Sequence, residues 1–234
     1  VLCACSTAPK DVLPNKAAQP TEAPTQQAQT TQAAPTEQPT PEPDLVQQLL
    51  EEMTLEQKVG QLFLVRPDSL DLSQTQDQIN DAKADGVTEL TDAMRQTLAE
   101  YPVGGVGIFG KNLESPQQIT QFLDDLQQAS DTPLFTAIDE EGGLVARLAN
   151  NAAFDLPQYE SAAAVGTSGN PEDARAMGRT IGGYLKEYGF NLDFAPVADV
   201  NTNPDNPVIG TRAFSSEPQT AADLVGGACA GFAD

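Results

Sequence analysis

Four short apolar segments, separated by longer stretches of helical character, constrain the fold of this chain more than any other feature. The segments lie near Leu62, Val103, Leu134 and Phe190 and contain few polar residues. A strand with one solvated face alternates apolar and polar residues, whereas these segments alternate poorly, as strands buried on both faces do. Strands that alternate with helices along a chain form a parallel sheet covered by helices. The sequence therefore predicts an α/β fold.

Helix-start signals fall between the apolar segments. Thr54–Gln57 reads as a capping box, and Ser115–Pro116 and Asn170–Pro171 each place a capping side chain before a first-turn proline. Residues 75–101 are polar and helical in composition, and a last helix begins near Pro218 and is still running at Asp234. A parallel eight-stranded (β/α)8 TIM barrel takes about 250 residues. Residues 44–234 therefore have room for about the first four βα units of such a barrel, and we expect the chain to be cut at both ends.

The first 43 residues differ from the rest in composition. Residues 6–43 are rich in Pro, Thr, Ala and Gln and contain no aromatic residue, which predicts a disordered linker because too little apolar surface is available to offset the entropy of ordering. Residues 1–5, VLCAC, are similar to the end of a bacterial lipoprotein signal peptide, and we expect Cys5 to be the lipidated residue. The alternative is a chance occurrence of this short pattern.

Charge and residue usage exclude several functions. The net charge is −22, and residues 44–234 hold 30 of the 34 acids and 10 of the 12 bases. So acidic a surface argues against nucleic acid or an anionic membrane as a partner. The chain has no histidine, which removes Ser-His-Asp and Cys-His chemistry and most zinc sites. We expect no metal and no cofactor, and we expect Cys229, among small residues, to be buried.

The segment from Leu134 to Leu148, LFTAIDEEGGLVARL, is the strongest indication of a ligand site. Its apolar run ends at Asp139, and the C-terminal ends of parallel barrel strands form the rim where ligands bind. Two glycines then permit a tight turn that would bring Arg147 back towards the acids. The alternative is a surface acidic turn, and the segment by itself leaves the two interpretations equally open.

Four ordered motifs resemble the N-terminal catalytic domain of glycoside hydrolase family 3, particularly its β-N-acetylhexosaminidase branch. The motifs are MTLEQKVGQLF at residues 53–63, VGGVGIF at 103–109, IDEEGGLVARL at 138–148 and GFNLDFAPVADVNTNPDNPVIGTRAF at 189–214. The resemblance extends from Leu49 to about Phe214. It implies the barrel fold and a carbohydrate substrate.

The resemblance also implies roles for individual residues. Asp139 would accept hydrogen bonds from hydroxyl groups of the terminal sugar, and Arg147 and Arg212 would donate to the same sugar. The alternatives are a purely structural ion pair between Asp139 and Arg147, and a solvent-exposed loop position for Arg212. Glu140 and Glu141 are expected to support the site. Asp199 would either face the barrel mouth or cap its loop, and Leu144, where many relatives have arginine, is expected to matter little.

The family's Lys-His and Pro-Gly-His-Gly motif and its aspartate nucleophile would follow Asp234, so we expect no catalytic residue in this chain. The resemblance implies an exo-acting, retaining β-N-acetylhexosaminidase that removes terminal β-linked N-acetylglucosamine, with peptidoglycan fragments as a natural substrate. This chain would hold only the sugar-recognition half and would be inactive alone. The alternatives are a family 3 β-glucosidase and a non-catalytic sugar-binding surface lipoprotein. The expected location is the extracellular face of the cytoplasmic membrane, reached through the lipid anchor alone.

Overall fold

Four parallel strands form the central sheet of the computed structural model, which describes residues 44–234. The strands are β1 (Leu64–Val65), β2 (Gly105–Ile108), β3 (Phe135–Ile138) and β6 (Leu192–Asp193), and they neighbour one another in the order β1-β2-β3-β6. Every pair is parallel, with Val106 opposite both Val65 and Thr136. The α/β fold with a parallel sheet is therefore confirmed, while the closed eight-stranded barrel stays a prediction. The linker and Cys5 lie outside the described residues.

The strands occur at the four predicted places, although the two at the sheet edges are shorter than their apolar segments. β1 and β6 each have a hydrogen-bonded neighbour on one side within the described residues, so fewer of their residues take part in the ladder. β2 and β3 are paired over four residues, from Gly105 with Phe135 to Ile108 with Ile138. The two longest strands are thus the two with neighbours on both sides.

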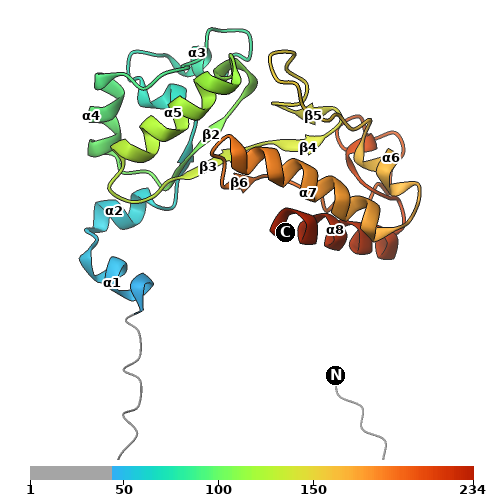
Figure 1. The fold of residues 1–234 in the computed structure, drawn as a ribbon. Helices are drawn as coiled ribbons and strands as arrows, with labels where there is room; N and C mark the ends of the chain where they lie inside the picture. The colour runs from blue at the N-terminus through green and yellow to red at the C-terminus, as the bar shows by residue number, and fades with distance from the viewer. Residues whose placement is uncertain (1–43) are drawn as a thin grey trace, which may run out of the picture. The chain divides into compact units, whose positions relative to one another are not determined.

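Helices and short 3₁₀ turns fill the connections between strands (Figure 1). The predicted starts at Thr54, Ser115 and Asn170 are confirmed, because each side chain accepts a hydrogen bond from a first-turn backbone N–H. Residues 75–101 form two helices, and Gly86 lies in the segment that divides them, as the sequence predicts. The α-helices are α1 (Leu45–Glu52), α2 (Leu55–Gly60), α3 (Gln76–Asn80), α4 (Asp92–Glu100), α5 (Pro116–Ala129), α6 (Ala162–Gly166), α7 (Pro171–Glu187) and α8 (Pro218–Ala233), and the 3₁₀ helices are η1 (Pro67–Leu70), η2 (Gly110–Asn112) and η3 (Gly210–Arg212).

The core lies between the sheet and its helices. From α5 it takes Ile119, Phe122, Leu123 and Leu126, which recur every three or four residues and so share one helix face. Figure 1 shows α7 and α8 lying side by side, as their contacts require. No helix within residues 44–234 is both long enough and apolar enough to span a membrane.

Our expectation for Cys229 was wrong. Its side chain is exposed, because α8 turns Ala221, Leu224 and Ala228 towards the core and the residue after Ala228 faces away from it. The small residues around Cys229 suggested burial, but the helix period decided which of them are buried.

Candidate functional site

The turn after β3 folds back on itself as a small hairpin. β4 (Glu140–Gly142) pairs antiparallel with β5 (Val145–Ala146). Gly142 and Gly143 have φ of 81° and 72°, in the left-handed region, and a Cβ on Gly143 would lie 2.8 Å from the backbone of Ser161. The predicted tight glycine turn is therefore confirmed. Figure 1 shows the hairpin extending from β3 towards α6.

The hairpin brings Arg147 to Asp139, as the sequence predicted. Arg147 Nη2 donates to Asp139 Oδ2 at 3.0 Å, and the two side chains remain 34% and 28% exposed. The ion pair considered as an alternative to a ligand site therefore exists, but it does not exclude one. A carboxylate has about four acceptor positions, and in the described part of the chain Asp139 accepts this hydrogen bond alone. Its remaining acceptor positions are free for a ligand.

Glu140 is the structural centre of the turn. Its carboxylate is fully buried and accepts hydrogen bonds from Leu148 N at 2.8 Å, Ala149 N at 2.9 Å and the Tyr184 hydroxyl at 2.9 Å. These bonds tie the start of the hairpin to its end and to α7. Because nothing outside the protein can reach it, Glu140 supports the site and does not itself contact a ligand.

Glu141 holds Arg212 by a two-point contact. Arg212 Nε and Nη2 donate to Glu141 Oε2 and Oε1 at 2.7 and 2.6 Å. The Arg212 side chain is 23% exposed, so the alternative of a free loop arginine does not hold. The carboxylate of Glu141 raises the pKa of the guanidinium, and the charges of Asp139 and Asp199 act in the same direction. Arg212 is thus fixed beside the hairpin, on a different acid from the one that binds Arg147.

Asp193 belongs to the same group of acids, although the sequence reasoning missed it. It ends β6, the neighbour of β3, and its Oδ1 accepts from Glu140 N at 2.9 Å. Burial, and the nearby charges of Glu140, Asp139 and Glu141, raise the pKa of Asp193 to about 7. Oδ2 is buried and has no hydrogen-bond partner among the described residues. The signal was available, because an apolar strand ending in aspartate is the pattern that selected Asp139.

The other predicted features lie around this group. Asp199 is exposed, and within residues 44–234 its side chain accepts no hydrogen bond from its loop, so no loop-capping contact is present there; a position at the barrel mouth stays a prediction. Leu144 is 76% exposed at the hairpin tip, and its small influence stays a prediction. The described residues contain no group of three or more acids or cysteines placed to hold a metal ion.

A hollow in the surface is lined by other residues than these. It has a volume of about 550 Å³ and is lined mainly by apolar side chains of α2 and of the segments before β1 and β2, among them Leu55, Val59, Phe63 and Val103. A sugar needs convergent polar groups and this hollow offers few. The acids and arginines at the strand ends are therefore the candidate site. They provide acceptors and fixed cationic donors suited to recognising hydroxyl groups.

Comparison with known proteins agrees with this chemistry. The model of the glycosyl hydrolase family 3 N-terminal domain matches residues 54–234. A β-hexosaminidase A from Pseudoalteromonas piscicida is 36% identical over 143 residues, which are 59% of this chain and 24% of that protein. A family 3 β-N-acetylglucosaminidase from Paenibacillus sp. str. FPU-7 superposes with a TM-score of 0.65 at 34% identity, covering 78% of this chain and 31% of that one.

A third relative was solved with a sugar derivative. NagZ from Neisseria gonorrhoeae, in complex with N-trifluoroacetyl-D-glucosamine, superposes with a TM-score of 0.57 at 26% identity, covering 63% of this chain and 43% of that one. The chain thus spans less than half the length of each of these relatives. With the family model matching most of its length, the chain belongs to glycoside hydrolase family 3 and carries that family's N-terminal domain.

Proposed function

We propose that this chain is the sugar-recognition part of an exo-acting, retaining β-N-acetylhexosaminidase that removes terminal β-linked N-acetylglucosamine, with peptidoglycan fragments as its natural substrate. The observation that carries the proposal is the grouping of Asp139–Arg147 and Glu141–Arg212 around one hairpin of a family 3 domain. The names of the relatives, β-hexosaminidase and β-N-acetylglucosaminidase, support the choice of sugar.

In this proposal each side chain has a distinct task. Asp139 accepts hydrogen bonds from sugar hydroxyls through the acceptor positions that Arg147 leaves open. Arg147 orients the carboxylate, and Arg212, fixed by Glu141, presents its outward N–H groups to the same sugar. Retaining hydrolysis also requires a nucleophile and an acid/base group, which we place in a part of the protein beyond these 234 residues.

The experiment compares β-N-acetylglucosaminide and β-glucoside chromogenic substrates, using the full-length protein that contains this chain. We expect hydrolysis of the N-acetylglucosaminide, and a kcat/KM about 10- to 100-fold lower in Asp139→Asn, because a hydrogen bond to a charged acceptor contributes about 1.5–3 kcal/mol. Asp131→Asn, an exposed acid at the other end of β3, serves as the matched control and should leave kcat/KM unchanged.

Each alternative has its own outcome. Preferential hydrolysis of the glucoside would identify a β-glucosidase, and binding of N-acetylglucosamine without hydrolysis of either substrate would identify a non-catalytic sugar-binding protein. An Asp139→Asn variant with wild-type kcat/KM would refute the assignment of Asp139. The 234-residue chain alone should give no turnover, and activity comparable with that of the full-length protein would contradict its role as the recognition half.

The proposal includes the location. A lipid on Cys5 would hold the protein at the extracellular face of the cytoplasmic membrane, with residues 6–43 as a tether to the domain. In cells, Cys5→Ser should move the protein from the detergent phase to the aqueous phase in Triton X-114 partitioning, while Cys3→Ser should not. Equal partitioning of the two variants would argue against lipidation at Cys5.

A further inference from the structure

The ring of Phe109 is contacted by two guanidinium groups. Arg66 Cζ lies 4.1 Å from the ring centroid and Arg147 Cζ lies 5.7 Å from it, both within the range of a cation–π interaction. Arg66 follows β1, Phe109 follows β2, and Arg147 belongs to the hairpin that follows β3. The contacts therefore connect the ends of three neighbouring strands, from Arg66 through Phe109 to Arg147, which pairs with Asp139.

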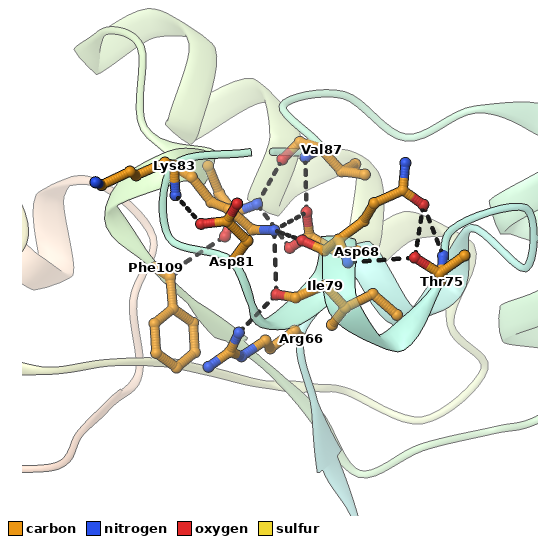
Figure 2. Close-up of polar contacts among 11 residues, drawn as sticks. Arg66, Asp68, Thr75, Ile79, Asp81, Lys83, Val87 and Phe109 are labelled. Carbon is orange, nitrogen blue, oxygen red and sulfur yellow. Dashed lines mark hydrogen bonds and ion pairs between the residues drawn. The ribbon is translucent and has the colours of Figure 1, made fainter. Parts of the chain in front are cut away.

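The backbone of Phe109 is held by a buried polar network (Figure 2). Its N–H donates to Asn112 Oδ1 at 3.0 Å, and Asn112 Nδ2 donates to Asp68 Oδ2 at 3.1 Å. Asp68 and Asn112 are completely buried, and Lys111 Nζ lies 3.2 Å from Asp68 Oδ1. A buried charge with its partners satisfied is rigid, because any displacement leaves an unpaired charge. The backbone of Phe109 is therefore firmly placed.

Arg66 is attached to the same network. Its Nη1 donates to the Ile79 carbonyl at 2.6 Å, and Lys111 Nζ donates to that same oxygen at 3.1 Å. Figure 2 shows the Arg66 guanidinium between this carbonyl and the Phe109 ring. Within residues 44–234 Arg66 forms no ion pair, although the chain is strongly acidic. Among the described residues Arg66 therefore has one hydrogen-bond acceptor, the Ile79 carbonyl, and a cation–π contact with the Phe109 ring.

Arg147 has few other restraints. Among the described residues it makes a single hydrogen bond, to Asp139, and its Nε is buried without a partner. A long side chain with several rotatable bonds loses considerable entropy when it is fixed, and one hydrogen bond leaves it free to pivot. The Phe109 ring supplies the second point of contact.

We propose that Phe109 and Arg66 are positioning residues, which orient Arg147 and through it the Asp139 carboxylate for binding of the terminal sugar. The aromatic face of Phe109 attracts the Arg147 guanidinium, and Arg66, anchored through Ile79 to the buried network, fixes the ring from the side of β1. Neither residue needs to touch the sugar. This inference rests on the proposed function, because it assigns Arg147 and Asp139 to sugar binding.

The experiment measures inhibition of the full-length enzyme by N-acetylglucosamine, together with kcat and KM. Phe109→Leu keeps an apolar side chain of similar volume but removes the aromatic face. Ki and KM should therefore rise about fivefold, within the roughly two- to thirtyfold range that the free energies of cation–π contacts allow. The value of kcat should change little. Phe109→Tyr, which retains the ring, should restore wild-type values. Phe135→Leu, a half-exposed phenylalanine at the start of β3, is the matched control and should have no effect.

A double-mutant cycle separates positioning from general damage to the fold. In an Arg147→Gln background Phe109→Leu should cause no further rise in Ki, because the ring then has no guanidinium to orient. Arg66→Gln should raise Ki about twofold on its own and not at all in the Phe109→Leu background. In the Arg66→Gln variant the Ile79 carbonyl still accepts a hydrogen bond from Lys111 Nζ. We therefore expect this variant to stay folded, so that it tests the proposal even if Phe109→Leu destabilises the protein.

The geometry has a readout that does not depend on the sugar. The Arg147 Nε–H signal in a ¹H–¹⁵N spectrum should be shifted by the ring current of Phe109, keep that shift in Phe109→Tyr and lose it in Phe109→Leu. An unchanged signal in Phe109→Leu, or additive effects in the cycle, would overturn the positioning role. If wild-type protein binds no N-acetylglucosamine, the proposed function fails and this role fails with it. If Asp139→Asn weakens binding and Phe109→Leu does not, this role alone is wrong.

Discussion

Replacing Glu140 with glutamine changes one atom in the centre of the site, yet it should destabilise the whole domain. The three groups that bind Glu140 are all donors: two backbone N–H groups and the hydroxyl of Tyr184. Oε1 accepts from Ala149 N and Tyr184, and Oε2 accepts from Leu148 N. A glutamine amide has only one oxygen, so in either orientation its NH₂ group faces at least one of these donors.

The cost follows from these three bonds. In the better orientation the new glutamine side chain keeps the two bonds at Oε1 as neutral hydrogen bonds and leaves the buried N–H of Leu148 without an acceptor, which costs about 1–3 kcal/mol. The two bonds that are kept also weaken, since bonds to a charged acceptor are roughly twice as strong as neutral ones. The expected loss is therefore about 3 kcal/mol in the free energy of unfolding. For a domain of this size that corresponds to a fall of roughly 6–12 °C in Tm.

Urea unfolding of the full-length protein at pH 6 measures this loss. That pH lies below the pKa of about 7 of Asp193, where protonation limits the repulsion between Asp193 and Glu140. Glu89→Gln, the same substitution at an exposed position, should change the free energy of unfolding by less than about 0.5 kcal/mol. Tyr184→Phe removes one donor to Glu140 and should cost about 1.5–3 kcal/mol. If Glu140→Gln were as stable as Glu89→Gln, the conclusion that the Glu140 carboxylate organises the turn would be refuted.

Two further predictions concern the neighbouring acids. The folded-state pKa of Asp193, about 7, lies above the usual value of about 3.9. Between about pH 4 and 7 the folded state therefore holds a proton that the unfolded state has lost. The contribution of Asp193 to stability falls as the pH rises through that window. The free energy of unfolding of Asp193→Asn, measured relative to wild type in urea, should therefore rise by up to about 4 kcal/mol between about pH 4 and pH 8. An equal difference between variant and wild type at both pH values would contradict this. Arg212→Lys can make only one of the two contacts with Glu141, so it should lower the free energy of unfolding by about 1–2 kcal/mol. Arg95→Lys, in an exposed pair at 3.7 Å, is its control and should cost under about 0.5 kcal/mol; equal losses would count against the two-point contact.

The local features of this protein could be predicted because their causes are local. The Thr54 capping box depends on residues three positions apart, and the helix starts at Ser115 and Asn170 depend on a capping side chain beside a proline. The turn at Gly142 and Gly143 requires positive φ, which glycine tolerates best. The return of Arg147 to Asp139 followed from that turn, eight residues apart in sequence.

The partners of the remaining site residues depend on distant parts of the chain. Glu141 and Arg212 are 71 residues apart, Glu140 and Tyr184 are 44 apart, and Glu140 and Asp193 are 53 apart. The sequence motifs indicated that Glu140 and Glu141 would support the site. They did not indicate that Glu140 would be buried and bound by Tyr184 of α7, or that Glu141 would bind Arg212. Asp193 was overlooked because its role depends on β6 lying beside β3.

The sequence by itself determined the parallel α/β fold and the acidic turn at the end of the third apolar segment, because periodicity, capping and glycine turns act within a few residues. The family followed from the resemblance of four ordered motifs. Only the tertiary structure decided which acid binds which arginine, which carboxylate is buried with a raised pKa, and that Arg66 and Arg147 share the ring of Phe109. These outcomes depend on strand order and on which side chains the packing removes from water. The free energy of a charged group is set by its burial and by the charges and hydrogen-bond partners nearest to it.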